Sequence, residues 1–127
     1  MNTTQNSKNC IYKIPCECGK FYIGESSRPL DTRINEHQNY IKNKQFEKSQ
    51  ICKHAWDYGH RIQFQNTSIL HKEENNSRRK IKESALILLN ENDCVANTSV
   101  EICRSWLPII KDEISKTNLR LQYPVSG

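Results

Sequence analysis

Two short β-prone runs joined by a turn constrain the fold of this chain more than any other feature. Ile11–Ile14 alternates apolar side chains, and Phe21–Gly24 is a second run of the same kind. The segment between them, Cys16–Lys20, is polar and contains a glycine. This pattern predicts a β-hairpin. Tyr12 and Tyr22 then lie on its two arms, where their phenols can face each other if the turn sets that register.

Two helices are predicted after the hairpin. The first begins near Asp31, whose side chain can cap a helix, and continues to about Lys44. The second is shorter and extends from Ser49, a favoured capping residue, to Gly59, which is suited to a helix C-terminus. The polar segment between them, Lys42–Lys48, is predicted to be a loop.

The second half of the chain adds one predicted strand and two predicted helices. Phe64–Leu70 is β-prone, and Asn75 or Asn76 opens the strongest helix of the sequence. A last amphipathic helix is predicted over residues 106–114. The sum is an α+β fold with a small, mainly antiparallel sheet flanked by helices.

Length and composition are those of one small domain. The chain has 127 residues, a formal net charge of +5 and 35% hydrophobic residues, which allows a modest core. We assign a flexible leader to residues 1–9, the folded domain to 10–118 and a C-terminal tail to 119–127. Since no apolar run approaches the roughly 18 residues of a membrane span and the N-terminus is polar, we expect neither membrane insertion nor secretion.

A cluster of basic residues enters the predicted helix after residue 75. Such a run is either a solvated helix face or a surface that meets phosphates. The net positive charge favours a polyanionic partner but is shared by many proteins without one. The cluster consists of Arg78, Arg79, Lys80 and Lys82.

The six cysteines admit two interpretations. A secreted disulfide scaffold would fit the four Asn-x-Ser/Thr sequons, but the cysteine spacings show no regular framework. A reducing compartment, with some thiols on a metal ion and others buried as small hydrophobes, fits the spacings better.

One set of thiols and imidazoles has the composition of a zinc site. Cys16 and Cys18 lie in the predicted turn, one residue apart and poorly placed to pair with each other, and His54 and His60 flank the short helix. Two thiolates and two imidazoles can hold Zn²⁺ tetrahedrally. Cys52 is a competing ligand, and free thiols with surface histidines are the alternative.

The tyrosines are followed by groups that suit phosphodiester hydrolysis. Arg33 and His37 are four residues apart and project from one side of the predicted helix. A guanidinium matches phosphate oxygens, an imidazole can carry a proton, and a phenol can activate water if a nearby positive charge lowers its pKa. Taken singly, Tyr12 and Tyr22 fit ordinary strand packing, and the helix pair fits an amphipathic surface.

Glu83 is a single acid inside the strongest predicted helix. It falls on a different side from the apolar stripe of Ile81, Ala85 and Leu88. One carboxylate together with phosphate oxygens and waters is a sensible Mg²⁺ site. The alternative is an exposed glutamate paired with a neighbouring lysine or arginine.

These patterns together resemble the GIY-YIG nuclease domain and, more narrowly, the endonuclease domain of Penelope-like retroelements. The first motif has Cys10 where the family has glycine, and the Cys-x-Cys spacing is shorter than usual for that group. The matching stretches span about residues 10 to 107, in family order: CIYKIPCECGKFYIGESSRPLDTRINEH, SQICKHAWDYGH, RKIKESALIL and ANTSVEICRSW.

The resemblance implies a three-stranded antiparallel sheet flanked by helices, and it implies a role for each matching residue. Tyr12 corresponds to the proposed general base, Tyr22 to the second tyrosine and Gly24 to the glycine that closes its motif. Arg33 corresponds to the phosphate-stabilising arginine, His37 to the assisting histidine, Glu83 to the metal-binding acid and Asn97 to the bracing asparagine. The zinc ligands of that group correspond to Cys16, Cys18, His54 and His60.

The function implied is a DNA endonuclease that uses Mg²⁺ or Mn²⁺ for catalysis and Zn²⁺ for structure. It would nick one strand in the nucleus, and the exposed 3′ end would prime synthesis by a fused or associated reverse transcriptase. The alternative is a zinc-stabilised nucleic-acid-binding module with a catalytically degenerate nuclease fold, which Cys10 favours.

Overall fold

A three-stranded antiparallel sheet forms the centre of the protein. The computed structural model describes residues 7–90 and 92–95, with positions 108 and 112. Strands β1 (Cys10–Pro15), β2 (Phe21–Ser26) and β3 (Ser68–Lys72) pair in the order β2-β1-β3. The predicted hairpin and the predicted α+β class with an antiparallel three-stranded sheet are therefore confirmed.

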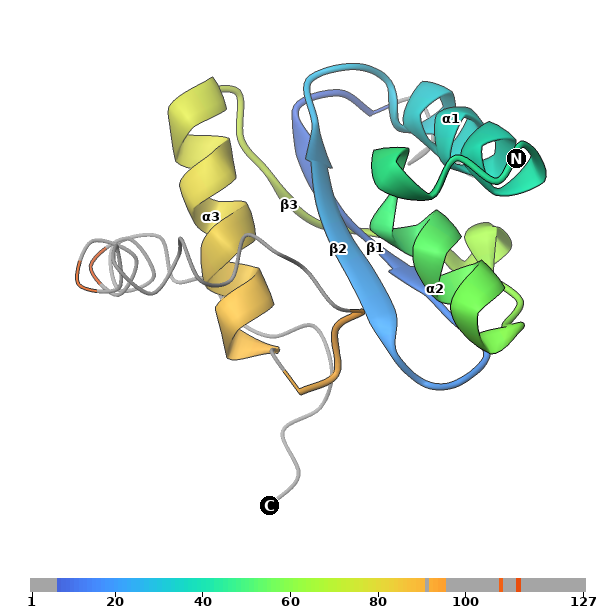
Figure 1. The fold of residues 1–127 in the computed structure, drawn as a ribbon. Coiled ribbons are helices and arrows are strands. Elements are labelled where there is room, and N and C mark those ends of the chain that lie inside the picture. The colour runs from blue at the N-terminus through green and yellow to red at the C-terminus, as the bar shows by residue number, and fades with distance from the viewer. Residues whose placement is uncertain (1–6, 91, 96–107, 109–111, 113–127) are drawn as a thin grey trace.

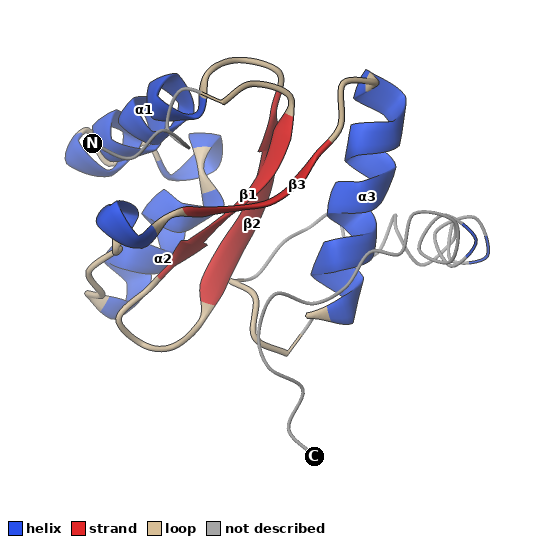
Figure 2. Ribbon diagram, turned by 180° about the vertical axis from the view of Figure 1, so that it is seen from behind, coloured by secondary structure: helices blue, strands red, loops and turns tan. Residues whose placement is uncertain are grey.

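Helices cover both faces of this sheet. Figure 1 shows α1 (Leu30–Lys42) and α2 (Gln50–Tyr58) on one side and α3 (Asn76–Leu89) on the other, and Figure 2 shows the same layers from behind. Two short 3₁₀ turns, η2 (Phe46–Lys48) and η3 (Phe64–Asn66), join these elements. None of the helices in the described part of the chain has both the length and the apolar character needed to cross a membrane.

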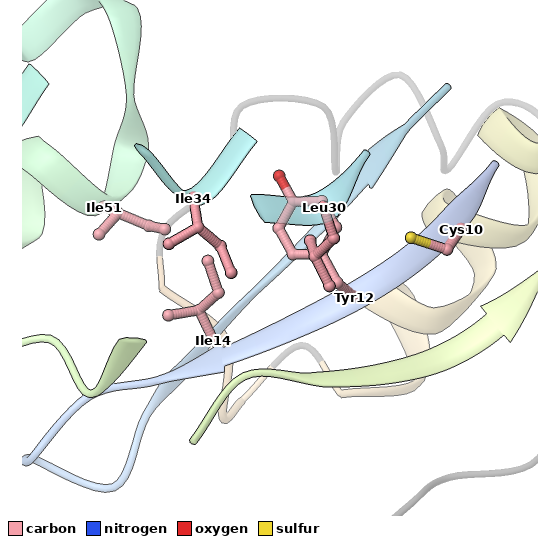
Figure 3. Close-up of a cluster of buried hydrophobic side chains, with 6 residues drawn as sticks. All are labelled: Cys10, Tyr12, Ile14, Leu30, Ile34 and Ile51. Carbon is pink, nitrogen blue, oxygen red and sulfur yellow. The ribbon is translucent and has the colours of Figure 1, made fainter. Parts of the chain in front are cut away.

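The alternation of side chains along β1 divides the interior into two cores. The core beneath α1 and α2, drawn in Figure 3, contains Cys10, Tyr12, Ile14, Leu30, Ile34 and Ile51. The core beneath α3 contains Ile11, Phe21, Ile23, Leu86, Ile87 and Cys94. Because Tyr12 belongs to the first core, its phenol faces α1 rather than α3.

The predicted caps of two helices are confirmed. The Ser49 hydroxyl accepts a hydrogen bond from the Cys52 amide at the start of α2, and Gly59 closes that helix in a left-handed conformation with φ of 66°. Asn75 caps α3 by accepting from the Arg78 amide at 2.9 Å. Local polar chemistry therefore defines where these two helices begin.

Other element boundaries differ from the prediction. The segment predicted as one strand over Phe64–Leu70 splits into the η3 turn and β3, because the Thr67 hydroxyl and amide both donate to the Phe64 carbonyl and close a turn there. The polar segment predicted as a loop contains η2. Helix α1 begins after Pro29 without a side-chain cap, and Asp31 accepts instead from the adjacent Thr32 amide.

Some predicted elements lie wholly or largely outside the described residues. Of the last predicted helix, only positions 108 and 112 are described, and residue 97 is not. Within the predicted leader, the Ser7 carbonyl accepts from the Leu30 amide at 2.9 Å, and the Asn9 carbonyl accepts from Glu73 at 2.8 Å.

The basic cluster at the start of α3 combines exposed and buried side chains. Arg78 and Lys80 are exposed, but Arg79 and Lys82 are only 2% and 4% exposed. Arg79 donates to Glu25 of β2 at 2.7 Å. Lys82 donates to the Glu73 carboxylate at 2.6 Å and to His71 at 3.0 Å. The cluster is therefore not one uniform surface, whether solvated or phosphate-binding. Its two buried members, Arg79 and Lys82, hold α3 on the sheet.

The buried pair between α3 and β2 gives a test of this packing. Replacing Arg79 with glutamine leaves Glu25 without its cationic partner, so Arg79→Gln should lower the free energy of unfolding by about 3 kcal/mol. The exposed neighbour supplies the control, since Arg78→Gln should change it by no more than about 0.5 kcal/mol. Urea denaturation measures both, and equal effects would contradict the assigned burial.

Candidate functional site

The register of the hairpin brings the two tyrosines together. Tyr12 lies opposite Gly24, and Tyr22 lies opposite Ile14, so the two phenols are diagonal neighbours on one face. Their ring centroids are 6.2 Å apart. A Cβ on Gly24 would lie 2.6 Å from the Tyr12 hydroxyl and 2.7 Å from the Tyr22 ring. This position therefore requires glycine for the close approach of the two rings.

His37 of α1 contacts both tyrosines from above the sheet. Its Nε2 is 3.2 Å from the Tyr12 hydroxyl, and its ring centroid is 5.4 Å from that of Tyr22. Its Nδ1 is 2.8 Å from the Ser49 hydroxyl at the start of α2. Burial and the nearby Arg33 charge lower the pKa of His37 to about 3, so the ring is neutral at physiological pH.

Arg33 provides the positive charge of the site. It lies one helical turn before His37 and donates to the Glu36 carboxylate at 2.9 Å. Arg28 holds the same carboxylate through two hydrogen bonds of 2.7 and 2.8 Å. Burial opposes the charge on Arg33, but Tyr12, Glu36 and Tyr22 outweigh it and raise the pKa of Arg33. The guanidinium therefore remains charged beside the phenols.

Glu83 reaches the same region from α3. Burial, followed by the neighbouring Glu25 carboxylate, raises the pKa of Glu83 to about 7, while Lys80, Arg33 and Arg79 oppose this rise. Its charge in turn acts on both tyrosines. Within the described residues no hydrogen bond or salt bridge is formed by the Glu83 carboxylate. The alternative of an exposed glutamate paired with Lys80 or Arg79 therefore does not hold there.

The apolar stripe of α3 also differs from the prediction. Ala85 is buried as expected, but Ile81 and Leu88 are only half-buried, and Leu86 and Ile87 fill the core instead. This rotation of the buried face explains why Glu83 is half-buried near the sheet rather than solvated.

Both phenols resist ionisation in this environment. Burial and the Tyr22 hydroxyl raise the pKa of Tyr12 well above its usual range, and Arg33 opposes that shift. Burial and Glu83 raise the pKa of Tyr22 to about 12, again opposed by Arg33. Tyr12 is 0% exposed, whereas Tyr22 is half-buried. A cation near Glu83 would remove one cause that raises both pKa values.

We call these five residues the tyrosine site: Tyr12, Tyr22, Arg33, His37 and Glu83. They come from β1, β2, α1 and α3: the two phenols and His37 are in contact, and the charges of Arg33 and Glu83 act on both phenols. Perturbed pKa values gathered at one position are typical of functional sites. The chemistry available is a guanidinium for an anion, a carboxylate for a cation, and phenols for proton transfer or water positioning.

A second set of residues, the Cys2His2 cluster, lies at the other end of the hairpin. It consists of Cys16, Cys18, His54 and His60, whose ligand atoms all lie within 4.8 Å of one another. His54 Nε2 is 3.4 Å from Cys18 Sγ and 3.1 Å from His60 Nδ1. The left-handed Gly59 reverses the chain so that His60 returns to the end of α2.

The geometry of the Cys2His2 cluster fits a metal ion such as zinc. Tetrahedral Zn²⁺ with ligand distances of about 2.0–2.3 Å separates its ligand atoms by roughly 3.3–3.8 Å. Burial, then the neighbouring His60 and Lys20, lower the pKa of His54, which favours the neutral imidazole that a metal needs. The competing residue Cys52 lies elsewhere, because its thiol donates to the Tyr40 carbonyl at 3.1 Å.

The cysteines of the described residues are free thiols. They are Cys10, Cys16, Cys18, Cys52 and Cys94. Cys10 begins β1 with its side chain fully buried in the first core, so this strand accommodates a Cβ where the family motif has glycine.

Ser49 and Glu36 contact members of the tyrosine site, His37 and Arg33, but were not singled out as functional by sequence. Ser49 was identified only as a helix cap, and its contact with His37 across twelve residues depends on how α2 packs on α1. Glu36 is three residues from Arg33, and this spacing predicts an ion pair on a helix. That spacing was the sequence signal from which the contact of Glu36 with the site could have been found. Asn97 lies outside the described residues.

Comparison with known proteins leaves the site to be interpreted on its own geometry. No family model, no curated protein and no solved structure matches this chain.

Removing a ligand tests the Cys2His2 cluster directly. Cys18 is exposed, so Cys18→Ser should cost little folding energy but should weaken Co²⁺ or Zn²⁺ binding by about 100-fold or more, because one thiolate is lost. Cobalt titration, followed by the absorption of tetrahedral Co²⁺, measures the affinity.

Cys52→Ser is the matched control for this experiment. A serine hydroxyl can still donate to the Tyr40 carbonyl, so the metal affinity should be unchanged. A metal that binds equally well to the Cys18→Ser variant, or that is lost from Cys52→Ser, would rule out the assigned ligands.

Proposed function

We propose that this chain is a divalent-metal-dependent DNA endonuclease of the GIY-YIG type that nicks one strand. The observation that carries the proposal is the meeting of Tyr12, Tyr22 and His37 within hydrogen-bonding or ring-contact distance, with Arg33 and Glu83 acting on both phenols. This set provides an anion-binding group, a cation-binding group and proton-transfer groups, which are the requirements of phosphodiester hydrolysis.

Each side chain has a defined task in the proposed reaction. Arg33 binds the scissile phosphate and stabilises the negative charge that develops on its oxygens. Tyr12, as phenolate, accepts a proton from the attacking water, and the resulting hydroxide bonds to phosphorus as the opposite P–O bond breaks. Tyr22, which is half-buried, positions that water.

Glu83 is the proposed ligand of Mg²⁺ or Mn²⁺. Its carboxylate is half-buried, has a raised pKa and has no hydrogen-bonding partner among the described residues, which suits a cation ligand. The bound cation would supply positive charge for the phosphate and for the leaving oxygen. Removing the negative charge of Glu83 also favours ionisation of the two phenols.

Zinc has a structural role in this proposal. In the Cys2His2 cluster it would join the hairpin turn to α2, and α2 carries Ser49 at its start. Metal binding of this kind stabilises a small domain with a limited core. The catalytic cation and the structural cation thus occupy different ends of the hairpin.

Three parts of the proposal rest on the resemblance of the motifs to Penelope-like retroelements. They are the DNA substrate, the location in the nucleus and the reverse transcriptase partner. The described residues contain one tyrosine site, which favours nicking over double-strand cleavage. The free 3′ end would then prime reverse transcription by a fused or associated enzyme.

One observation favours the alternative of a nucleic-acid-binding module without catalysis. Tyr12 is completely buried and its pKa is raised, which is the environment of a core tyrosine. Such a module would bind DNA and leave the phosphodiester intact.

Glu83→Gln separates the two functions. With a supercoiled plasmid and Mg²⁺ or Mn²⁺, the unsubstituted protein should convert plasmid to the open circle, and Glu83→Gln should lose at least about 100-fold in rate because the cation ligand is removed. Glu74→Gln, at an exposed glutamate near the start of α3, is the control and should nick normally. A protein that retards the plasmid without nicking it is the binding module.

The same substitution should stabilise the metal-free protein at alkaline pH. Because folding raises the pKa of Glu83 from 4.5 to about 7, the stability that its protonated form provides is lost as the pH rises through 7. The free energy of unfolding of Glu83→Gln should therefore exceed that of the unsubstituted protein by about 3 kcal/mol at pH 8, with no difference below pH 4.5. A constant difference across this range would show that Glu83 ionises normally.

A further inference from the structure

A continuous series of hydrogen bonds extends from the sheet to the start of α2. Tyr12 of β1 contacts His37 Nε2 at 3.2 Å, and His37 Nδ1 contacts the Ser49 hydroxyl at 2.8 Å. The Ser49 hydroxyl oxygen also accepts from the Cys52 amide at 3.3 Å. All of these residues are buried, and Tyr12 and His37 are 0% exposed.

The available donors and acceptors fix the direction of each hydrogen bond in this series. The Cys52 amide can only donate, so the Ser49 oxygen accepts there. Among the described residues, the only other polar partner of the Ser49 hydroxyl is His37 Nδ1, so the hydroxyl proton has that nitrogen as its acceptor. A buried hydroxyl proton without an acceptor would be costly, so His37 Nδ1 carries no proton.

The tautomer of His37 follows from the same accounting. A neutral imidazole carries one proton, and Nδ1 is the acceptor, so the proton is on Nε2. Nε2–H then donates to the Tyr12 oxygen. The phenolic proton of Tyr12 is left free to point elsewhere.

We propose that Ser49 is a positioning residue that holds His37 in the Nε2–H tautomer, so that His37 donates a hydrogen bond to the Tyr12 oxygen instead of accepting the Tyr12 proton. The position of Ser49 is set by its role as N-cap of α2, and Ile51 in the first turn of that helix packs in the core that contains Tyr12. The Ser49 hydroxyl thus caps α2 and also orients the imidazole of His37 on α1.

This tautomer suits a phenolate at Tyr12, a consequence that rests on the proposed endonuclease function. A hydrogen bond to the charged form of a group favours that form, and here His37 Nε2–H and the Arg33 charge both favour the phenolate. A neutral His37 with Nδ1 protonated would present a lone pair to Tyr12 and would favour the phenol. Ser49 therefore acts on the reaction through His37 and touches no substrate.

Nitrogen NMR of the histidine rings tests the tautomer without any activity measurement. In the full chain labelled with ¹⁵N-histidine, two-bond proton–nitrogen correlations distinguish the protonated from the unprotonated ring nitrogen, and the His37→Gln variant assigns the signals. We expect Nε2 to be protonated and Nδ1 unprotonated at neutral pH. The reverse pattern, or an averaged pattern, overturns the proposal.

Two substitutions at Ser49 separate positioning from helix capping. Ser49→Gly removes the hydroxyl at little cost to the cap, so His37 should show mixed tautomers and the nicking rate should fall about tenfold. Ser49→Thr keeps the hydroxyl and should retain the tautomer and a rate within about twofold. A pure Nε2–H tautomer in Ser49→Gly overturns the role of Ser49.

The two readouts keep this inference distinct from the proposed function. If the chain never nicks DNA but the tautomer responds to Ser49 as described, the hydrogen-bond assignment stands and the endonuclease proposal fails. If the chain nicks DNA but His37 carries its proton on Nδ1, the endonuclease proposal stands and the assignment to Ser49 is wrong.

Discussion

The pairing register of β1 with β2 is the constraint on which the tyrosine site depends. It sets Tyr12 opposite Gly24 and Tyr22 opposite Ile14, so both phenols lie on the face that α1 covers. A shift of one residue would turn Tyr12 toward α3 and away from His37. Gly24 reinforces the register, because a larger residue there would collide with the Tyr12 hydroxyl. The hairpin thus fixes the positions of the two phenols, and the helices add the other three side chains.

The burial of Glu83 beside this hairpin is unfavourable for stability, because the ionised carboxylate is disfavoured there. Glu83 is half-buried with its pKa raised to about 7, and both phenols have raised pKa values. By contrast, the buried charges of Arg79 and Lys82 are fully paired with Glu25 and Glu73. Among residues 7–90 and 92–95, the ions that hold α3 on the sheet are therefore paired, whereas the Glu83 carboxylate near the phenols has no hydrogen-bonding or salt-bridge partner. Such a local exception is expected where a cation or substrate completes the interactions.

Sequence reasoning succeeded where local chemistry decides the outcome. The hairpin, the Ser49 and Asn75 caps and the end of α2 at Gly59 follow from short-range signals. The Cys2His2 cluster was a candidate from its residue types and was favoured by the family resemblance, because the spacing left alternatives open. Sequence reasoning failed where tertiary packing decides. The turn at Thr67 split the third strand, the burial of Arg79 depends on Glu25 in a distant strand, and the contact of Ser49 with His37 depends on the packing of two helices.

We propose that a cation at Glu83 and a DNA phosphate at Arg33 meet beside the two phenols. Anomalous diffraction from a crystal of the protein with Mn²⁺ and a short DNA duplex tests it most directly. We expect a manganese peak on the Glu83 carboxylate, with a backbone phosphate between it and the Arg33 guanidinium. Manganese bound elsewhere, with Glu83 free of metal and the phosphate remote from Tyr12 and Tyr22, would contradict it.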